Sequence, residues 1–259
     1  MSAQVANDPP DVPQPPSLPR SWRRRGVRLA LALATAVLAT GCASLPADSV
    51  RSPKDPWEGF NRGMFAFNEA VDGVLVKPLA EGYQRVVPSP ARDGVDNFLG
   101  NLGDAWSTLH LFLQAKPQQG LEMGMRTATN SVLGLGGVLD VASAVGLERS
   151  STEDTGQTLG RWGVKSGPYL VLPLFGPSTV RDALARPLDM AGSGPSLVFE
   201  HKADRSPATV LSVIHTRSRL LGAGRVLDEI ALDKYVLMRD AYLQRRRNQV
   251  YDGDPPDDP

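Results

Sequence analysis

The residues that could carry covalent chemistry do not form a catalytic pattern. Ser178 lies in the run Gly-Pro-Ser-Thr-Val, which differs from the G-x-S-x-G turn that exposes a nucleophilic serine. The carboxylates Glu153 and Asp154 are neighbours in the chain, a placement that favours a solvated turn over an acid–base pair. The chain has three histidines, and they show neither metal-ligand nor triad spacing: His110, His201 and His215. The sequence therefore predicts no enzyme and no metal site.

The single cysteine, Cys42, follows a segment unlike the rest of the chain. A cluster of arginines precedes a short apolar run at residues 29–39, and Thr40 and Gly41 lead from that run to the cysteine. A basic start, a short apolar core and small residues before a cut site are typical of a secretory signal peptide. A lone cysteine is ordinarily a small buried side chain, but this position resembles a bacterial lipobox, in which the thiol receives a diacylglycerol. We expect a signal peptide at residues 1–41 and a lipid on Cys42.

The composition of the remaining chain limits the other possibilities. The protein has 28 Lys and Arg against 28 Asp and Glu, so no excess of positive charge suggests nucleic-acid binding. The glycines at residues 134–137 lack the third glycine of a dinucleotide fingerprint, and we expect no cofactor. We expect a tether at residues 42–54, one domain at residues 55–247, and a disordered acidic tail at residues 248–259.

Apolar residues at helical spacing predict a mainly helical domain. Asp55 is placed to cap a helix that begins at Pro56, with Glu58 at capping-box spacing. An apolar stripe then follows one face of this helix, and Gly73 and Pro78 are expected to end or bend it. Further helices are predicted at residues 92–115, 117–133, 138–145, 178–190 and 207–221, and from 228 or 233 to 247.

Residues 152–177 differ from these helices because glycine and proline recur through them. They surround the apolar run at residues 169–175, in which Pro173 argues against a central strand. We expect an irregular apolar loop with at most one short strand.

Several segments resemble the MlaA/VacJ family of outer-membrane phospholipid-transport lipoproteins. The resemblance extends from Asp55 to Arg247 and begins with the run DPWEGFNR at residues 55–62. Its most specific parts are GQTLGRWG at residues 156–163, GPYLVLP at 167–173 and GPSTVRD at 176–182. Two departures from the family pattern are Thr155, where an aromatic residue is usual, and His110, which lies near an expected asparagine.

The resemblance implies a ring-like, multi-helix domain embedded in the inner leaflet of the outer membrane and facing the periplasm. It implies association with a trimeric porin. It further implies that mislocalised phospholipid passes from the outer leaflet through an amphipathic channel to a periplasmic carrier protein, which maintains lipid asymmetry without covalent chemistry. A structural lipoprotein that only scaffolds a porin would share the anchor and the apolar exterior, and this alternative stays open.

Two groups of residues are candidates for that function. Polar side chains that share helix faces could line a channel, although capping or buried hydrogen bonding between helices is the favoured explanation from sequence alone. Phe67, Asn68 and Gly73 are expected at a bend that sets how open the channel is. The channel or gating candidates are Asn61, Arg62, Phe67, Asn68, Gly73, Asn97 and Asn101. Donors for a passing phosphate are Arg62, Arg126 and Arg181. A C-terminal helix capped by Asp233 could dock the carrier, or could be an ordinary amphipathic helix; its docking candidates are Tyr235, Met238, Tyr242, Arg245 and Arg246.

Overall fold

The computed structural model describes residues 52–199 and 201–256 of the 259-residue chain. By its internal contacts the chain divides into two units, Met1–Ala43 and Ser44–Pro259, and only the second unit contains described residues. Cys42 and the signal peptide expected at residues 1–41 lie outside the described residues, as does most of the expected tether. The description below therefore concerns the second unit alone.

A long helical segment opens the domain and runs without interruption through three elements. These are helix α2 (Glu58–Val71), the π-helical turn η1 (Asp72–Val76) and helix α3 (Lys77–Val86). Of the two alternatives for Gly73 and Pro78, an end of the helix is wrong, because a π-helical turn continues the helix into α3, which contains Pro78; a bend there stays a prediction. A proline lacks the N–H group of a regular α-helix, and such bulges are a known way to accommodate irregular bonding.

The expectation that Asp55 caps the first helix is also wrong. Trp57 is the residue before α2, and its side chain makes no capping hydrogen bond. Asp55 is instead buried, and it accepts hydrogen bonds from Asn61 and from the Tyr235 hydroxyl of the last helix. The beginning of the domain is thus joined to its end.

A helical hairpin follows. Helix α4 (Ser89–Leu113) packs along helix α5 (Pro117–Val132), close to the predicted ranges. The expected helix at residues 138–145 shortens to α6 (Val141–Ala144), which Asp140 caps through the Ser143 backbone N–H. The intervening turn needs glycine at Gly137, where φ is +95° and an added Cβ would lie 2.7 Å from the Asn101 amide nitrogen.

Residues 152–177 contain more regular structure than the sequence predicts. Helix α7 (Thr155–Arg161) comes first, and strands β1 (Tyr169–Leu172) and β2 (Gly176–Thr179) then form an antiparallel hairpin. Tyr169 pairs with Thr179, and Leu172 pairs with Gly176. Pro173 lies in the turn just beyond β1, where its missing N–H removes no bond from the hairpin.

The chain ends in three further helices. Helix α8 (Val180–Gly192) is followed by the 3-10 turn η2 (Gly194–Leu197), by α9 (Lys202–Ile230) and by α10 (Lys234–Val250). Helix α9 is longer than expected and contains Pro207. The expectation of a disordered tail from residue 248 is wrong at its start, because α10 continues to Val250 and a turn follows it.

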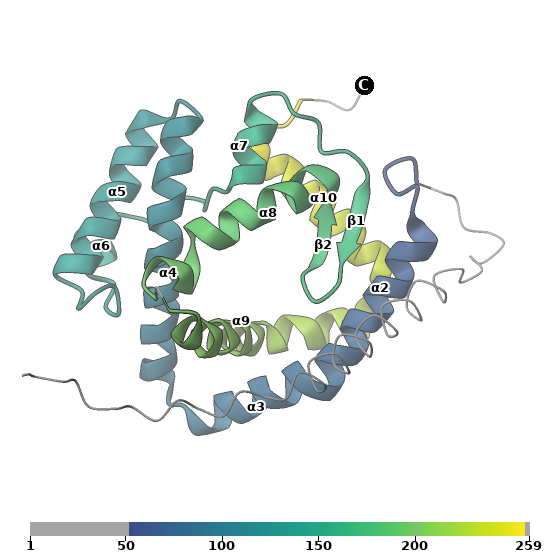
Figure 1. The fold of residues 1–259 in the computed structure, drawn as a ribbon, viewed down its shortest axis with the longest axis horizontal. Coiled ribbons are helices and arrows are strands. Elements are labelled where there is room, and N and C mark those ends of the chain that lie inside the picture. The colour runs from purple at the N-terminus through teal and green to yellow at the C-terminus, as the bar shows by residue number, and fades with distance from the viewer. Residues whose placement is uncertain (1–51, 200, 257–259) are drawn as a thin grey trace, which may run out of the picture. The chain divides into compact units, whose positions relative to one another are not determined.

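The elements of this unit contact one another in a closed circuit, visible in Figure 1. Helix α2 leads through η1 to α3, α3 packs against α9, and α9 reaches η2 and α8. Helix α8 contacts β1, and β1 returns to α2. The fold is therefore mainly helical, as the sequence predicts, and its parts follow one another around this circuit.

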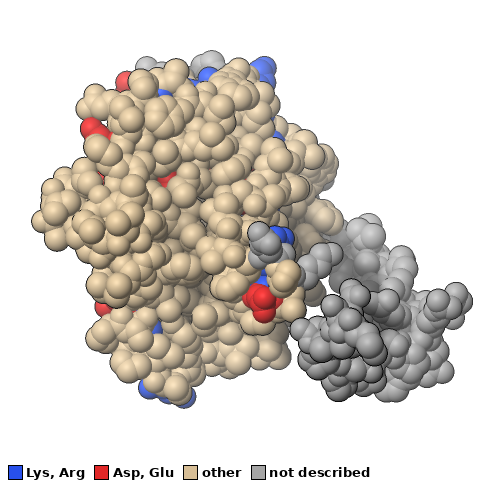
Figure 2. All heavy atoms as spheres, turned by 60° about the vertical axis from the view of Figure 1, so that its left-hand side comes forward, with Lys and Arg blue, Asp and Glu red and all other residues tan. Residues whose placement is uncertain are grey.

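The distribution of side chains is inverted relative to that of a water-soluble helical protein. On α5, one exposed strip is apolar and contains Leu121 (60% exposed), Met125 (51%) and Val132 (79%). Arg126 and Asn130 of the same helix are each only 2% exposed. Figure 2, turned toward the side that carries α4 to α6, shows few charged residues on this face. Large exposed apolar surfaces mark sites of contact with proteins or lipid.

Helix α4 shows the same distribution, with apolar side chains exposed and polar side chains buried. Its exposed apolar residues include Leu109, Phe112 and Leu113, whereas Asp104 and His110 are buried. Within the described ranges, no helix is long and apolar enough to cross a membrane.

Candidate functional site

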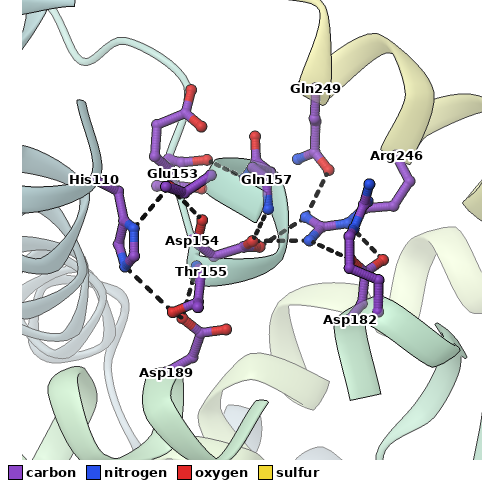
Figure 3. A network of polar contacts seen from close by, with 12 residues as sticks. His110, Glu153, Asp154, Thr155, Gln157, Asp182, Asp189, Arg246 and Gln249 are labelled. Atoms are coloured by element: carbon purple, nitrogen blue, oxygen red, sulfur yellow. Dashed lines mark hydrogen bonds and ion pairs between the residues drawn. The ribbon is translucent and has the colours of Figure 1, made fainter. Parts of the chain in front are cut away.

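An ion-pair cluster joins α7, α8 and α10, shown in Figure 3. Arg246 of α10 donates to both carboxylate oxygens of Asp154, at 2.7 and 2.8 Å, and to both oxygens of Asp182, at 3.0 and 3.1 Å. Asp154 also caps α7 through the backbone N–H of Gln157, at 2.8 Å. One guanidinium therefore ties the start of α7 to the first turn of α8.

The charges in this cluster hold one another ionised. Burial alone would raise the pKa of Asp182, but the Arg246 hydrogen bonds and charge, together with Arg181 and the Tyr242 hydroxyl, lower it to about 2. The pKa of Asp154 is lowered in the same way, and that of Arg246 is raised despite its burial. All three groups remain charged at neutral pH, which suits a fixed structural junction.

A second set of polar contacts joins α4 to the same junction. Asp189 of α8 accepts hydrogen bonds from the Trp106 indole N–H at 2.9 Å and from the Thr155 hydroxyl at 2.6 Å. His110 of α4 lies 2.8 Å from the Thr158 hydroxyl and 3.3 Å from the Thr155 hydroxyl. Burial lowers the pKa of His110, which favours the neutral imidazole. The two departures from the family pattern, His110 and Thr155, are thus in contact with each other.

Glu153, just before α7, is a further buried polar residue at this junction. Its carboxylate accepts a hydrogen bond from Gln114 at 2.9 Å and forms an ion pair with Lys116 at 3.5 Å. Burial raises its pKa. Its backbone N–H donates to the Ser107 hydroxyl at 3.0 Å.

The acidic residues of these contacts, Glu153, Asp154, Asp182 and Asp189, border a cavity of about 410 Å³ between α7, α8 and α10. Arg186, Met190 and Ser193 of α8 line it, and Arg245 and Arg246 line it from α10. The volume lies in the usual range for a small-ligand site, about 300–1,000 Å³. Over residues 52–199 and 201–256, the structure contains no group of three or more side chains suited to hold a metal ion.

The asparagines predicted to line a channel serve other purposes. Asn61 is fully buried, and its amide group is occupied by Asp55, by the Tyr169 carbonyl and by the Val171 N–H. These bonds give Asn61 a structural role, and its channel role stays a prediction. Asn68 bonds the hairpin in the same way, donating to the Leu172 carbonyl at 2.9 Å.

The other asparagines bond neighbouring loops and helices. Asn97 donates to the Val138 carbonyl at 3.1 Å. Asn101 is 3% exposed and donates to the Ser131 hydroxyl at 2.9 Å, while its carbonyl oxygen is buried without a hydrogen-bond partner. Of the remaining gating candidates, Phe67 is half-buried on α2 and Gly73 is exposed in η1. Their gating role stays a prediction.

The three arginines predicted as phosphate donors are engaged within the protein. Arg62 pairs with Glu58 and Asp233, each at 2.8 Å. Arg126 pairs with Asp140 at 2.8 Å and donates to the Leu147 carbonyl at 2.6 Å. Arg181 bonds Asp182 and the Val164 carbonyl. Their role as donors for a passing phosphate stays a prediction.

Three of the five docking candidates on α10 bond other parts of the domain, and their docking role stays a prediction. Tyr235 is 3% exposed and donates to Asp55, Tyr242 donates to Asp182 at 2.8 Å, and Arg246 forms the cluster described above. These side chains face the body of the domain. Asp233 does cap the helix, by accepting from the Val236 N–H at 3.1 Å. Met238 is half-buried and Arg245 is exposed.

Sequence reasoning missed Arg186 altogether. The residue shares one face of α8 with Asp182, Asp189 and Met190, a spacing that is readable from the sequence. What the spacing does not reveal is which of these charges find partners, because those partners come from α4, α7 and α10.

The fold and the site define a helical domain with an apolar exterior and a polar interior. The chain belongs to the MlaA lipoprotein family, whose model matches residues 53–249. It is 40% identical over 220 residues to the intermembrane phospholipid transport system lipoprotein MlaA of Escherichia coli (strain K12), covering 83% of this chain and 85% of that protein. It is 31% identical over 225 residues to the protein of the same name from Haemophilus influenzae, covering 86% and 90%.

The fold matches a solved structure. A chain solved in work on the structural basis for maintenance of bacterial outer membrane lipid asymmetry aligns with a TM-score of 0.67 and 36% sequence identity. The alignment covers 77% of this chain and 100% of that one.

Proposed function

We propose that this protein is an outer-membrane lipoprotein that removes mislocalised phospholipid from the outer leaflet and passes it to a periplasmic carrier. In this proposal a lipid on Cys42 anchors the chain, and the helical domain lies in the inner leaflet on the periplasmic side. The names of the relatives support a role in phospholipid transport.

The observation that carries the proposal is the inverted side-chain distribution of α4 and α5. A helix that buries Arg126 and Asn130 while exposing Leu121, Met125 and Val132 is costly in water. In lipid, the same arrangement places apolar groups against acyl chains and satisfies the polar groups internally. The exterior of this domain therefore suits a bilayer leaflet or an apolar partner such as a porin trimer.

The route for the lipid would follow the closed circuit of elements. Helix α2 and the β-hairpin meet on this circuit, and the exposed hairpin residues Leu174 and Phe175 lie at the turn between the strands. The π-helical turn η1 contains Gly73 and follows directly after α2. In this turn the backbone hydrogen-bond pattern changes while the helix continues into α3. We propose that Phe67 and Gly73 set how open this route is.

The test is the lipid composition of the outer leaflet in cells of the source bacterium that lack the gene. We expect phospholipid to accumulate there and to return to normal when the wild-type chain is supplied. The Cys42→Ala variant should lack an acyl mass on that residue and restore asymmetry poorly. Unchanged asymmetry in the deletion strain, together with co-purification of the wild-type protein with a porin from wild-type cells, would overturn transport in favour of the scaffold alternative.

A further inference from the structure

Arg186 is a charged side chain without a compensating bond. Its Nε atom is buried and has no hydrogen-bond partner. In the described part of the chain its guanidinium makes no hydrogen bond or ion pair, and it lies over the Phe175 ring, whose centroid is 4.4 Å from Cζ. Burial lowers the pKa of this guanidinium.

The carboxylates that line the same cavity are already bonded to other groups. Asp154 and Asp182 share Arg246, and their four oxygens accept its N–H groups. Asp189 accepts from Trp106 and Thr155. Glu153 is held by Gln114 and Lys116, so each of these carboxylates has hydrogen-bond donors of its own, whereas the Arg186 guanidinium has only the nearby charges of Asp189 and Asp154.

An unpaired, partly buried guanidinium is expensive, and an unsatisfied buried donor in a folded protein calls for an explanation. A planar guanidinium bonds the oxygens of a phosphate or carboxylate with two parallel N–H groups. Arg245, which lines the cavity from α10 and is exposed, adds a second positive charge. The cavity is therefore built for an anion that enters from outside.

We propose that this cavity binds the phosphodiester group of a phospholipid, with Arg186 as the residue that bonds the phosphate. The inference rests on the proposed function and names a binding site for its substrate. The phosphate group in this site could belong to a lipid headgroup or to a free phosphate ion. Two features favour a lipid: the cavity has about 410 Å³, and it is lined by the exposed side chain of Met190 and by Pro177 as well as by charged groups.

The neighbouring surface supports the lipid as the source. Phe175, which stacks on Arg186, is 48% exposed at the hairpin turn. Met190 is 54% exposed, one turn along α8 from Arg186. Acyl chains of a lipid whose headgroup lies at Arg186 would find these apolar side chains at the cavity mouth.

The experiment uses the purified, delipidated full chain held in an amphipathic polymer, and it measures binding by calorimetry. The first probe is dioctanoyl phosphatidylglycerol below its micelle concentration, which carries the phosphodiester and two acyl chains. The second is inorganic phosphate, and the third is dioctanoylglycerol, which has the chains alone. We expect the wild-type chain to bind the first probe most tightly.

The key variant is Arg186→Gln, with Arg186→Lys as the conservative change. Because Arg186→Gln removes the charge-assisted hydrogen bonds to the phosphate, it should weaken phosphatidylglycerol binding by about tenfold or more, and Arg186→Lys by less. Binding of dioctanoylglycerol should not change. The matched control is Arg161→Gln, an exposed arginine on α7 that does not line the cavity, and it should bind like the wild type.

A thermal unfolding measurement separates ligand binding from a structural role. Because Arg186 has no bonding partner within the domain, Arg186→Gln should leave the Tm of the lipid-free protein unchanged or higher. If Arg186→Gln does lower the Tm, Arg186→Met, which keeps the apolar stem over Phe175, takes its place in the binding assay.

The outcomes are distinct. Equal Kd values for phosphatidylglycerol in the wild type and in the folded variant overturn this site but leave the proposed function standing. Inorganic phosphate binding as tightly as phosphatidylglycerol also overturns it, in favour of a site for a free ion. A wild-type chain that binds neither acyl probe overturns the proposed function together with this inference.

Discussion

Asn68 repeats, seven residues along α2, the contact that Asn61 makes with strand β1. Asn61 accepts from the Val171 N–H at 2.9 Å and donates to the Tyr169 carbonyl at 3.1 Å. Asn68 accepts from the Leu174 N–H at 2.7 Å and donates to the Leu172 carbonyl. Seven helical residues rise about 10.5 Å, and three strand residues extend about 10 Å. The two side chains therefore meet peptide groups three residues apart and bond the edge of the hairpin as a neighbouring strand would.

Replacing these asparagines should destabilise the domain unequally. Asn61→Leu leaves a buried carbonyl, a buried N–H and one Asp55 oxygen without partners, and each such loss costs about 1–3 kcal/mol. We expect the free energy of unfolding to fall by roughly 3 kcal/mol or more, as measured by urea unfolding in detergent. Asn68→Leu, at a less buried position, should cost about half as much and increase amide exchange at Leu174.

The control for both is Asn97→Leu, which removes one partly exposed hydrogen bond to Val138. A loss of about 1 kcal/mol or less is expected there. An Asn61→Leu loss no larger than the Asn97→Leu loss would show that the hairpin does not depend on this contact.

The asparagine pair also shows what the sequence can and cannot reveal. The helical spacing of Asn61 and Asn68 places them on one face, and the sequence supports that much. Their partner lies more than 100 residues later, in a segment whose glycines and prolines suggest an irregular loop. A short strand at the edge of a two-stranded hairpin has little apolar periodicity of its own. The helices α4, α5, α8 and α10 were predictable because their apolar stripes are local.

The Arg246 cluster should make stability depend on acidity. A group whose pKa is lowered in the folded state contributes stability above its unfolded pKa and loses it as pH falls through the folded value. For Asp182 that window runs from the ordinary value of 3.8 down to about 2. Unfolding followed at pH 5, 4, 3 and 2 should therefore show a loss of roughly 2 kcal/mol from this group, at about 1.4 kcal/mol for each pKa unit.

Arg246→Met should remove this pH dependence and lower stability at neutral pH. The change leaves Asp154 and Asp182 buried without their main partner, which typically costs about 3–5 kcal/mol. Arg247→Met, one residue along the same helix, serves as the control. A wild-type slope below pH 4 that survives in Arg246→Met would mean that other carboxylates produce it.

His110 should give a separate dependence at higher pH. Burial lowers its pKa, so between pH 7 and 5 the unfolded chain takes up a proton more readily than the folded one. Stability is therefore fully present above about pH 6.5 and falls as the solution is acidified. His110→Asn should reduce this slope, while His201→Asn, at an exposed position before α9, should keep it. Equal slopes in the two variants would count against a neutral buried His110.

Only part of the candidate site could be predicted from the sequence. The basic run at Arg245 and Arg246 was visible as the last turn of a helix, where such residues often stay in solvent. The fold instead brings Arg246 to Asp154, 92 residues earlier, and to Asp182, 64 residues earlier. Whether a charge is paired depends on such distant contacts, so the unpaired state of Arg186 could emerge only from the assembled fold.

The apolar face of α5 should determine how the domain associates with membranes. Leu121→Lys with Met125→Lys places two charges on that face, and a lysine in the centre of a bilayer costs about 2.5–3.5 kcal/mol. In a Cys42→Ala background, which removes the expected lipid anchor, we expect this double variant to float far less with phosphatidylethanolamine–phosphatidylglycerol vesicles than its parent. The matched control is Gln118→Lys with Glu122→Gln, which changes the net charge equally at exposed polar positions of the same helix. Both variants should keep near-ultraviolet circular dichroism, because none of the four side chains is buried. If the apolar-face variant floats as well as the control, α5 does not lie against acyl chains, and its exposed residues are better explained as a contact with another protein.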